Sequence, residues 1–251
     1  MTVGLICAIP EELAHLRDVL DGVRTTMVAH ASFHEGVLDG RQVVLAGAGM
    51  GKVNAAIVST VLAVEFSCSG IVLSGVAGGL DPALDIGDVV IAEQVLQHDS
   101  GRIENGRLLR YQPGHVSFIN PTEHFGYAAD PAILAAVKRR LEGVVLPSMP
   151  RSAGGHDRPP RITYGTVVTG DQYIHCEATR QSLHQTFAAS AAEMEGGAVA
   201  QVCESFGIPW LVIRALSDLA GRDSAFDFPL FVDRVAATSA YLVRQILPVL
   251  P

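Results

Sequence analysis

"GIVLSGVAGG", residues 70–79, is the stretch that decides the fold, because it is an apolar run that ends in small residues. Its apolar residues follow one another instead of alternating with polar ones, a pattern typical of a strand covered by helices on both faces. Such strands belong to the parallel sheets of α/β proteins, which bind ligands at the carboxyl ends of their strands. Val76, Ala77 and Gly78 lie at that end, where backbone N–H groups can face a ligand.

Similar runs recur along the chain with helical patterns between them, which predicts an α/β protein with a largely parallel sheet. The other expected strands cover residues 3–9, 42–48, 88–96, 161–170 and 209–218. Helices are expected over residues 10–20, 52–65, 130–142, 177–187, 195–206 and 229–247. Pro10 and Pro229 suit helix starts, because a proline there loses no intrahelical hydrogen bond.

The chain has 251 residues, 49% of them hydrophobic, which is enough for one large α/β domain with a sizeable core. Residues 101–127 and 147–161 contain the Gly and Pro residues typical of loops. Strand and helix patterns resume after each of these segments. We therefore expect a single domain over residues 1–251, with two surface excursions and no internal repeat.

Charge and hydropathy exclude two classes of partner. The net charge of −8 comes from 26 acidic and 18 basic residues without a Lys/Arg cluster, so nucleic acid is not an expected partner. No stretch approaches the roughly 20 apolar residues that span a bilayer. The start "MTVGLICAIPEE" lacks a basic leader and a cleavage signal, so we expect a cytoplasmic protein with no membrane partner.

The cysteines do not indicate a metal site. Cys7, Cys68, Cys176 and Cys203 are widely spaced in mainly apolar surroundings, which favours buried free thiols. His175 and Cys176 are adjacent, but a second cluster with ligand spacing is missing. We expect no bound metal.

"GAGMGKVNA", residues 47–55, resembles a phosphate-binding loop but departs from its spacing. Ala46 stands where the Walker pattern needs glycine, and Val53 stands where it needs Ser or Thr. The stretch is better interpreted as a close turn from a strand into the helix that begins near Lys52. The sequence leaves open whether a ligand binds beside this turn.

Acidic residues occur near three strand ends. "IPEEL" puts Glu12 in the first turn of a helix, where the alternative role is to complement the helix dipole. "RALSDLAG" ends a buried strand with Arg214, Ser217 and Asp218, which form either a helix cap, an ion pair or a catalytic group.

"AAEMEGGAVAQ", residues 191–201, reads as the start of a buried helix in which Glu193 and Glu195 flank Met194. A buried charge without a partner costs several kcal/mol, so these carboxylates must be paired, cap the helix or act on a ligand. Together with Glu12 and Asp218 they predict one pocket with acid/base chemistry at a sugar or glycosidic bond. A serine hydrolase is disfavoured, because the G-x-S-x-G pattern is missing.

Taken together, the motifs resemble the nucleoside phosphorylase-like family, and within it the methylthioadenosine/S-adenosylhomocysteine nucleosidases of the actinobacterial type. The resemblance extends from residue 3 to about residue 247. It rests on six stretches in order: "GLICAIPEEL", "GAGMGKVNAA", "SGVAGGLDPALDIGDVVIA", "TGDQYI", "AEMEGGAVA" and "IRALSDLAG".

The resemblance implies a three-layer α/β/α domain around a twisted mixed sheet, assembled as a homodimer. It also implies hydrolysis of the N-glycosidic bond of 5′-methylthioadenosine or S-adenosylhomocysteine, with release of adenine and a thio-substituted ribose and without a cofactor. In this match Asp218 protonates the leaving adenine, and Glu12 deprotonates the attacking water. Arg214 holds that water or orients the carboxylates.

The same resemblance implies a binding role for other residues. Glu195 accepts the 2′- and 3′-hydroxyls of ribose, Met194 packs beneath the sugar, and Glu193 is a partner of Arg214 or of the water. The remaining substrate-binding positions carried over are Ile9, Val76, Ala77, Gly78 and Ser217, Tyr173 on the adenine face, Ile174 at its edge, and Phe228, which lines the 5′ side with Ile9.

Three positions depart from the family pattern. Val76 replaces a common serine, Tyr173 a common phenylalanine, and Pro10 an acidic residue; the first two are expected to shift substrate preference. The excursion at 101–127, with Tyr111 and Pro113, is expected to reach the 5′ group in the neighbouring subunit.

Three alternative functions stay open from the sequence. A phosphorylase of this fold is disfavoured, because "CSGIVLSGVAGG" lacks the arginine that binds phosphate and Glu12 would repel the anion. A nucleosidase for futalosine or 5′-deoxyadenosine shares the same motifs. A nucleoside-binding protein without turnover is opposed by the presence of both Glu12 and Asp218.

Overall fold

In the computed structural model of this protein, the described residues are 1–111, 125–148, 158–221 and 224–251, with backbone alone for 224–230. The strands of the main sheet are β1 (Val3–Cys7), β2 (Asp21–Val28), β3 (Ala31–Leu38), β4 (Arg41–Gly47), β5 (Gly70–Gly79), β6 (Val89–Gln97), β9 (Tyr127–Ala128), β10 (Ile162–Thr169), β11 (Ala189–Glu193) and β12 (Trp210–Asp218). A separate hairpin consists of β7 (Gly101–Glu104) and β8 (Arg107–Arg110). The helices are α1 (Pro10–Arg17), α2 (Lys52–Val64), α3 (Pro131–Leu141), α4 (Glu177–Phe187), α5 (Gly196–Phe206) and α6 (Ser224–Ile246).

The main sheet is mixed, with the order β11-β10-β6-β12-β5-β1-β4-β3-β2. Strands β4, β1, β5 and β12 are parallel to one another, and β6, β10 and β11 form a second parallel group. The two groups meet where β12 pairs antiparallel with β6. The ends of β11 and β5 also pair antiparallel, so the five strands β5, β12, β6, β10 and β11 close on one another.

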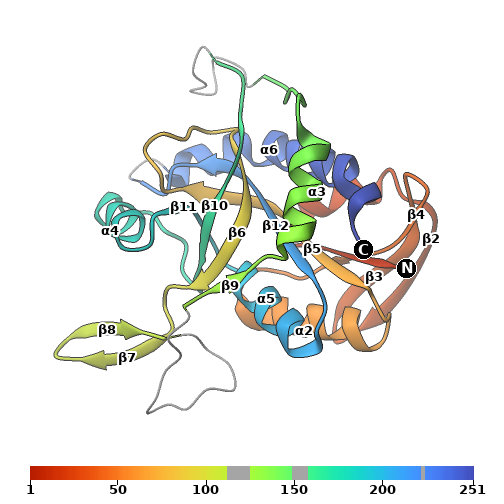
Figure 1. Ribbon diagram of the computed structural model, residues 1–251, viewed down its shortest axis with the longest axis horizontal. Helices are drawn as coiled ribbons and strands as arrows, with labels where there is room; N and C mark the ends of the chain where they lie inside the picture. The colour runs from red at the N-terminus through yellow and green to blue at the C-terminus, as the bar shows by residue number, and fades with distance from the viewer. Residues whose placement is uncertain (112–124, 149–157, 222–223) are drawn as a thin grey trace.

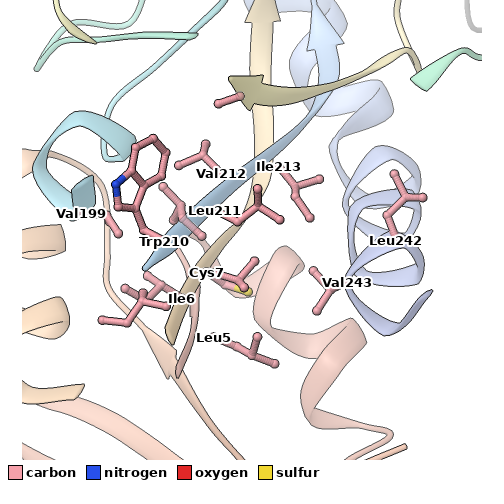
Figure 2. Packing of buried hydrophobic residues seen from close by; sticks show 14 of the residues in the cluster. Leu5, Ile6, Cys7, Val199, Trp210, Leu211, Val212, Ile213, Leu242 and Val243 are labelled. Carbon is pink, nitrogen blue, oxygen red and sulfur yellow. The ribbon is translucent and has the colours of Figure 1, made fainter. Parts of the chain in front are cut away.

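Helices cover both faces of the central strands (Figure 1). Helices α1 and α6 pack together on one side, and α2 and α5 on the other. Every residue of β12 is buried, and its neighbours come from both layers: Figure 2 shows Trp210 beside Val199 of α5, while Leu242 and Val243 of α6 lie on the opposite side. This three-layer arrangement confirms the predicted fold class and explains the uninterrupted apolar runs.

All six expected strands are present, as β1, β4, β5, β6, β10 and β12, and the expected helices form within a few residues of their predicted bounds, with one exception. Helix α6 begins at Ser224, so the expected start at Pro229 is wrong. A proline near the start of a helix removes one backbone hydrogen bond, and the packing of this long helix on β12 and β5 outweighs that loss.

Residues 191–193, which in the sequence resemble the approach to a buried helix, end strand β11, and helix α5 begins at Gly196, one residue after its expected start at Glu195. Alanine favours helix in isolation. Here, Ala191 and Ala192 pair with β10 on one side and with β5 on the other, so tertiary pairing determines the conformation.

The first expected excursion contains the hairpin β7–β8, which projects from the sheet (Figure 1). Pro113 and residues 149–157 of the second excursion lie outside the described residues. Cys7, Cys68 and Cys203 are buried free thiols, whereas Cys176 is exposed, against expectation, because it precedes α4 at the surface. In the described part of the chain, no helix combines the length and apolarity needed to cross a membrane, and no three His, Cys, Asp or Glu side chains form a metal-binding group.

Candidate active site

A cavity of about 380 Å³ opens where β1, β5, β11 and β12 end, a size typical of small-molecule sites. The residues that line it are Ala8, Ile9, Glu12, Met50, Val76, Ala77, Gly78, Gln172, Tyr173, Ile174, Ala192, Glu193, Met194, Glu195, Arg214, Ser217, Asp218 and Ala220. The sequence-predicted site residues are therefore gathered in one place, apart from Phe228. Its backbone lies in α6, and its side chain is outside the described residues.

Glu12 is buried in the first turn of α1, with its carboxylate turned into the cavity. Oε2 accepts hydrogen bonds from the backbone N–H groups of Ala8 (2.7 Å) and Ile9 (3.2 Å), and Oε1 accepts from that of Val76 (2.9 Å). Burial raises the pKa of Glu12, while nearby Arg214 and the three N–H donors oppose that rise. Glu12 therefore does more than complement the dipole of its own helix, since its oxygens also bind β5.

Arg214 is the largest fully buried side chain, at the centre of β12. Its Nη2 donates to Glu193 and, at 3.0 Å, to Glu195. Burial lowers the pKa of Arg214, but Glu193, Glu195 and Glu12 raise it more, so the guanidinium remains charged. Within the described residues, Nε and Nη1 have no hydrogen-bond partner in the protein.

Gly75 on β5 makes room for this charged group. A methyl group at Gly75 would lie 2.3 Å from Glu12 Oε1 and 2.6 Å from Arg214 Nη1, closer than atoms can approach. The unpartnered Nη1 therefore lies beside the carboxylate of Glu12, at the wall of the cavity.

Glu193, at the end of β11, is fully engaged by the protein. Its Oε1 accepts from the hydroxyl of Thr169, and its Oε2 accepts from Arg214 and from the backbone N–H groups of Glu195 (3.0 Å) and Gly196 (2.7 Å). Of the two roles expected for Glu193, the structure shows the pairing with Arg214. The same contacts fix the start of α5, and Glu195 is the residue that caps this start.

Glu195 is held from both sides. Oε1 accepts from the backbone N–H of Gly51 at 2.8 Å, and Oε2 accepts from Arg214. Burial raises the pKa of Glu195 to about 7; Arg214 opposes this rise, while the negative charge of Glu193 adds to it. Each carboxylate oxygen can accept more than one hydrogen bond, so Glu195 retains acceptor capacity toward the cavity.

Asp218 ends β12 at the other side of the cavity and is buried. Its Oδ2 accepts from the hydroxyl of Ser217 (3.0 Å), and its Oδ1 accepts from the backbone N–H of Ala220 (2.8 Å). Tyr173 and Ile174, in the loop after β10, supply an aromatic and an apolar wall. The arrangement places two buried carboxyl groups, Glu12 and Asp218, in one largely apolar cavity with a buried cation.

Several contributors were not expected from the sequence. Ala8, Met50, Gln172, Ala192 and Ala220 also line the cavity. Thr169 and Gly51 act through hydrogen bonds to Glu193 and Glu195. The glycine-rich stretch 47–55 was the available signal for Gly51, because a position beside a ligand was one of the alternatives left open for its turn; small apolar wall residues carry no comparable signal.

Comparison with known proteins agrees with this fold. Residues 2–248 match the sequence profile of the Phosphorylase superfamily. A 5′-methylthioadenosine/S-adenosylhomocysteine nucleosidase of Mycobacterium tuberculosis is 58% identical over 250 residues, covering 100% of this chain and 98% of the relative. A nucleosidase of the same name from Anoxybacillus flavithermus is 36% identical, covering 97% of both chains.

Solved structures extend the comparison. A 5′-methylthioadenosine/S-adenosylhomocysteine nucleosidase of Helicobacter pylori with butyl-thio-DADMe-Immucillin-A superposes with a TM-score of 0.83 at 26% identity, covering 99% of this chain and 98% of the other. Futalosine hydrolase of the same organism superposes with a TM-score of 0.81 at 26% identity, covering 99% and 97%.

Fold, site and profile together define a protein of the nucleoside phosphorylase-like class. The full-length identity to the curated relatives then decides the branch: the chain belongs to the 5′-methylthioadenosine/S-adenosylhomocysteine nucleosidase family of the Phosphorylase superfamily.

Proposed function

We propose that this chain hydrolyses the N-glycosidic bond of 5′-methylthioadenosine and S-adenosylhomocysteine, releasing adenine and the 5-thio-substituted ribose. The observation that carries this proposal is the gathering of Glu12, Arg214, Glu195 and Asp218 in one buried cavity. It is supported by the names of the relatives, which match this chain over its full length.

Asp218 is the general acid. Adenine leaves poorly as an anion, so its departure needs a proton from the enzyme. A carboxyl group donates a proton near neutral pH only when its surroundings favour the protonated form. The buried position of Asp218 at the end of β12 fits that requirement, and Ser217 and Ala220 fix the orientation of its carboxyl group.

Glu12 is the general base. As the glycosidic bond breaks, the ribose develops positive charge, and water must be held and deprotonated on the face opposite the base. The three backbone donors to Glu12 hold its carboxylate in place. Nη1 of Arg214, which has no partner among the described protein groups, is placed to donate a hydrogen bond to that water.

The ribose and the base are bound by the remaining wall. Glu195 accepts the 2′- and 3′-hydroxyls with charge-assisted hydrogen bonds, and Met194 packs beneath the sugar. Tyr173 stacks on adenine while Ile174 contacts its edge. Ile9 and Phe228 line the 5′ side.

Phosphorolysis is disfavoured by the charges at the cavity. Arg214 is the cation among the described lining residues, and Glu193 and Glu195 already neutralise it. Phosphate at the place of the water would also face the carboxylate of Glu12, which repels it.

One assay tests the reaction and the substrate. The protein is incubated with 5′-methylthioadenosine, S-adenosylhomocysteine, 5′-deoxyadenosine, inosine and futalosine, with and without phosphate, and the free base is measured by chromatography. We expect fastest release from the two thio-substituted nucleosides, independent of phosphate. Release that requires phosphate would make the protein a phosphorylase. Faster release from futalosine than from the other nucleosides would make the protein a futalosine hydrolase, like one of its structural neighbours. If no base is released from any substrate, a nucleoside-binding protein without turnover would be favoured.

We also propose a homodimer, because α2 leaves an apolar stripe exposed. Val53 is 71% exposed, and Ile57 and Val64 are exposed on the same helix at spacings that share a face. Met50, also exposed, continues the stripe to the cavity that it lines.

A cytoplasmic location is proposed from the buried free thiols of Cys7, Cys68 and Cys203, which fit a reducing compartment.

A further inference from the structure

Outside the cavity, Lys52, Asp99 and Asp171 form a compact charged cluster. Nζ of Lys52 lies 2.7 Å from Asp99 Oδ1 and 3.7 Å from Asp171 Oδ2. The backbone N–H of Lys52 donates to Asp171 Oδ1 at 2.8 Å, and the backbone N–H of Asp171 donates to Asp99 Oδ2 at 2.9 Å. The side chains of Lys52 and Asp99 are only 18% and 16% exposed, so water screens their attraction less than that of a surface pair.

The cluster joins three segments that are distant in the sequence. Lys52 begins α2, Asp99 follows β6, and Asp171 follows β10. Gly51, the residue before Lys52, donates the hydrogen bond that holds Oε1 of Glu195. The cluster therefore fixes the backbone on which this donor stands, and Gly51 itself adopts a positive φ of 98° that leaves its N–H directed at the carboxylate.

We propose that Lys52, Asp99 and Asp171 are positioning residues, which act through Gly51 to hold Glu195 where it accepts the ribose hydroxyls. None of the three lines the cavity of this chain, so they do not touch the substrate there. A loosened Lys52 allows the Gly51 N–H to move from Glu195, and a displacement of about 1 Å in such a site is enough to cost up to about 100-fold in rate. This inference rests on the proposed ribose role of Glu195.

The test combines a variant with a change in the substrate. Lys52→Met removes the ammonium group but keeps the backbone N–H that binds Asp171. The matched control is Lys138→Met, because Nζ of Lys138 lies at the same 2.7 Å from Glu93 Oε1 and neither residue lines the cavity. Values of kcat and KM are measured on 5′-methylthioadenosine and on its 2′,3′-dideoxy analogue, together with the Tm of each protein.

We expect Lys52→Met to lower kcat/KM on 5′-methylthioadenosine by about 10-fold or more, mainly through KM, and on the dideoxy analogue by less than about threefold. Comparing each variant with wild type on the same substrate cancels the different chemical lability of the two nucleosides. Lys138→Met should behave as wild type on both, and Lys52→Arg should recover part of the loss. Asp99→Asn, which keeps the size of the side chain, should reproduce the pattern if Lys52→Met does not fold.

Two results overturn the inference alone: no loss in Lys52→Met, or an equal loss on both substrates, which would mean a general structural role. A different result overturns the proposed ribose role as well. If wild type is indifferent to removal of both hydroxyls, Glu195 does not bind them, and nothing remains for the cluster to position.

Discussion

At the level of single residues, Glu12 and Asp218 carry the same functional group in different surroundings. Burial raises the pKa of Glu12, while three backbone N–H donors and the charged Arg214 oppose that rise by stabilising the carboxylate. Asp218 lies at the end of a fully buried strand, where the hydroxyl of Ser217 and the backbone N–H of Ala220 are among its donors. A base and an acid for one reaction require such a division between two carboxyl groups.

Asp218→Asn should therefore lower kcat by about 100- to 10,000-fold, because the amide does not deliver a proton to adenine, while nucleoside binding survives. Release of adenine and binding by calorimetry measure the two effects. Asp130→Asn is the matched control, since Asp130 also accepts the N–H two residues ahead, from Ala132 at 2.7 Å, but caps α3.

Glu12→Gln should likewise bind the nucleoside without turnover. Wild-type turnover by Asp218→Asn or Glu12→Gln would remove the assigned role.

Glu195 gives a prediction for pH. Its pKa of about 7 means that the carboxyl gains a proton as the pH falls through that value, and the neutral carboxyl binds two ribose hydroxyls more weakly, because it loses the negative charge and turns one acceptor oxygen into a donor. Glu12, with its pKa also raised by burial, must be ionised to act as base. The acid side of the profile of log(kcat/KM) against pH should thus approach a slope of about two.

In Glu195→Gln the slope should fall to about one, because only the ionisation of Glu12 remains. The measurement is kcat/KM on 5′-methylthioadenosine from acid to alkaline pH for both proteins. An unchanged slope in the variant would show that Glu195 does not titrate in the reaction.

At the level of elements, the site depends on how closely β5 approaches α1 and β12. Gly75 is the point of contact, since Glu12 Oε1 and Arg214 Nη1 occupy the space that a Cβ at this position would need. Strand β11 contributes in a different way, because its pairing with β10 and β5 carries Glu193 to Arg214. Neither contact is local in the sequence.

Gly75→Ala should displace Glu12 or Arg214 and lower kcat/KM by about 100-fold, with a loss of about 1–3 kcal/mol in the free energy of unfolding. Activity and chemical denaturation measure both. Gly47→Ala, on β4, is the matched control, because its new methyl group would meet Leu13 Cδ2 at an ordinary 3.4 Å. Equal behaviour of the two variants would contradict the proposed tight contact at Gly75.

At the level of the whole molecule, helices on both faces bury the central strands. The exposed apolar stripe on α2, formed by Val53, Ile57 and Val64, continues through Met50 to the cavity. A carboxylate in the middle of that stripe opposes the burial of an interface. Ile57→Glu should therefore weaken the proposed homodimer by about 10-fold or more in Kd and lower activity with it.

Sedimentation velocity over a range of concentrations measures the dimer. Val145→Glu, an exposed apolar position in the segment after α3, is the control and should leave the dimer intact. A wild-type protein that sediments as a monomer, or an Ile57→Glu variant that dimerises like wild type, would reject α2 as the interface.

Local pattern was sufficient for the six apolar strands and most helix bounds, because burial on both faces leaves a continuous apolar run that ends at a small residue. It failed for the short strands β7, β8 and β9 and for three strands of the main sheet, β2, β3 and β11. Strands β2 and β3 form a hairpin at the edge of the sheet, and β2 is largely exposed. Strand β11 is rich in alanine. These strands therefore lack the continuous apolar run of a buried strand.

By itself, the sequence determined the α/β class, the strand ends that precede Glu12 and carry Asp218, and the family resemblance, since these depend on residue type and spacing along the chain. Tertiary structure alone decided which groups touch: Gly51 on Glu195, Thr169 on Glu193, and Gly75 against Arg214. The physical reason is that a buried charge is satisfied by whatever donors the fold brings to it, and those donors are backbone and side-chain groups from distant segments. The two carboxylates that made "AEMEGG" unusual thus share Arg214 but differ in their other donors, Thr169 for Glu193 and Gly51 for Glu195, which spacing along the chain did not reveal.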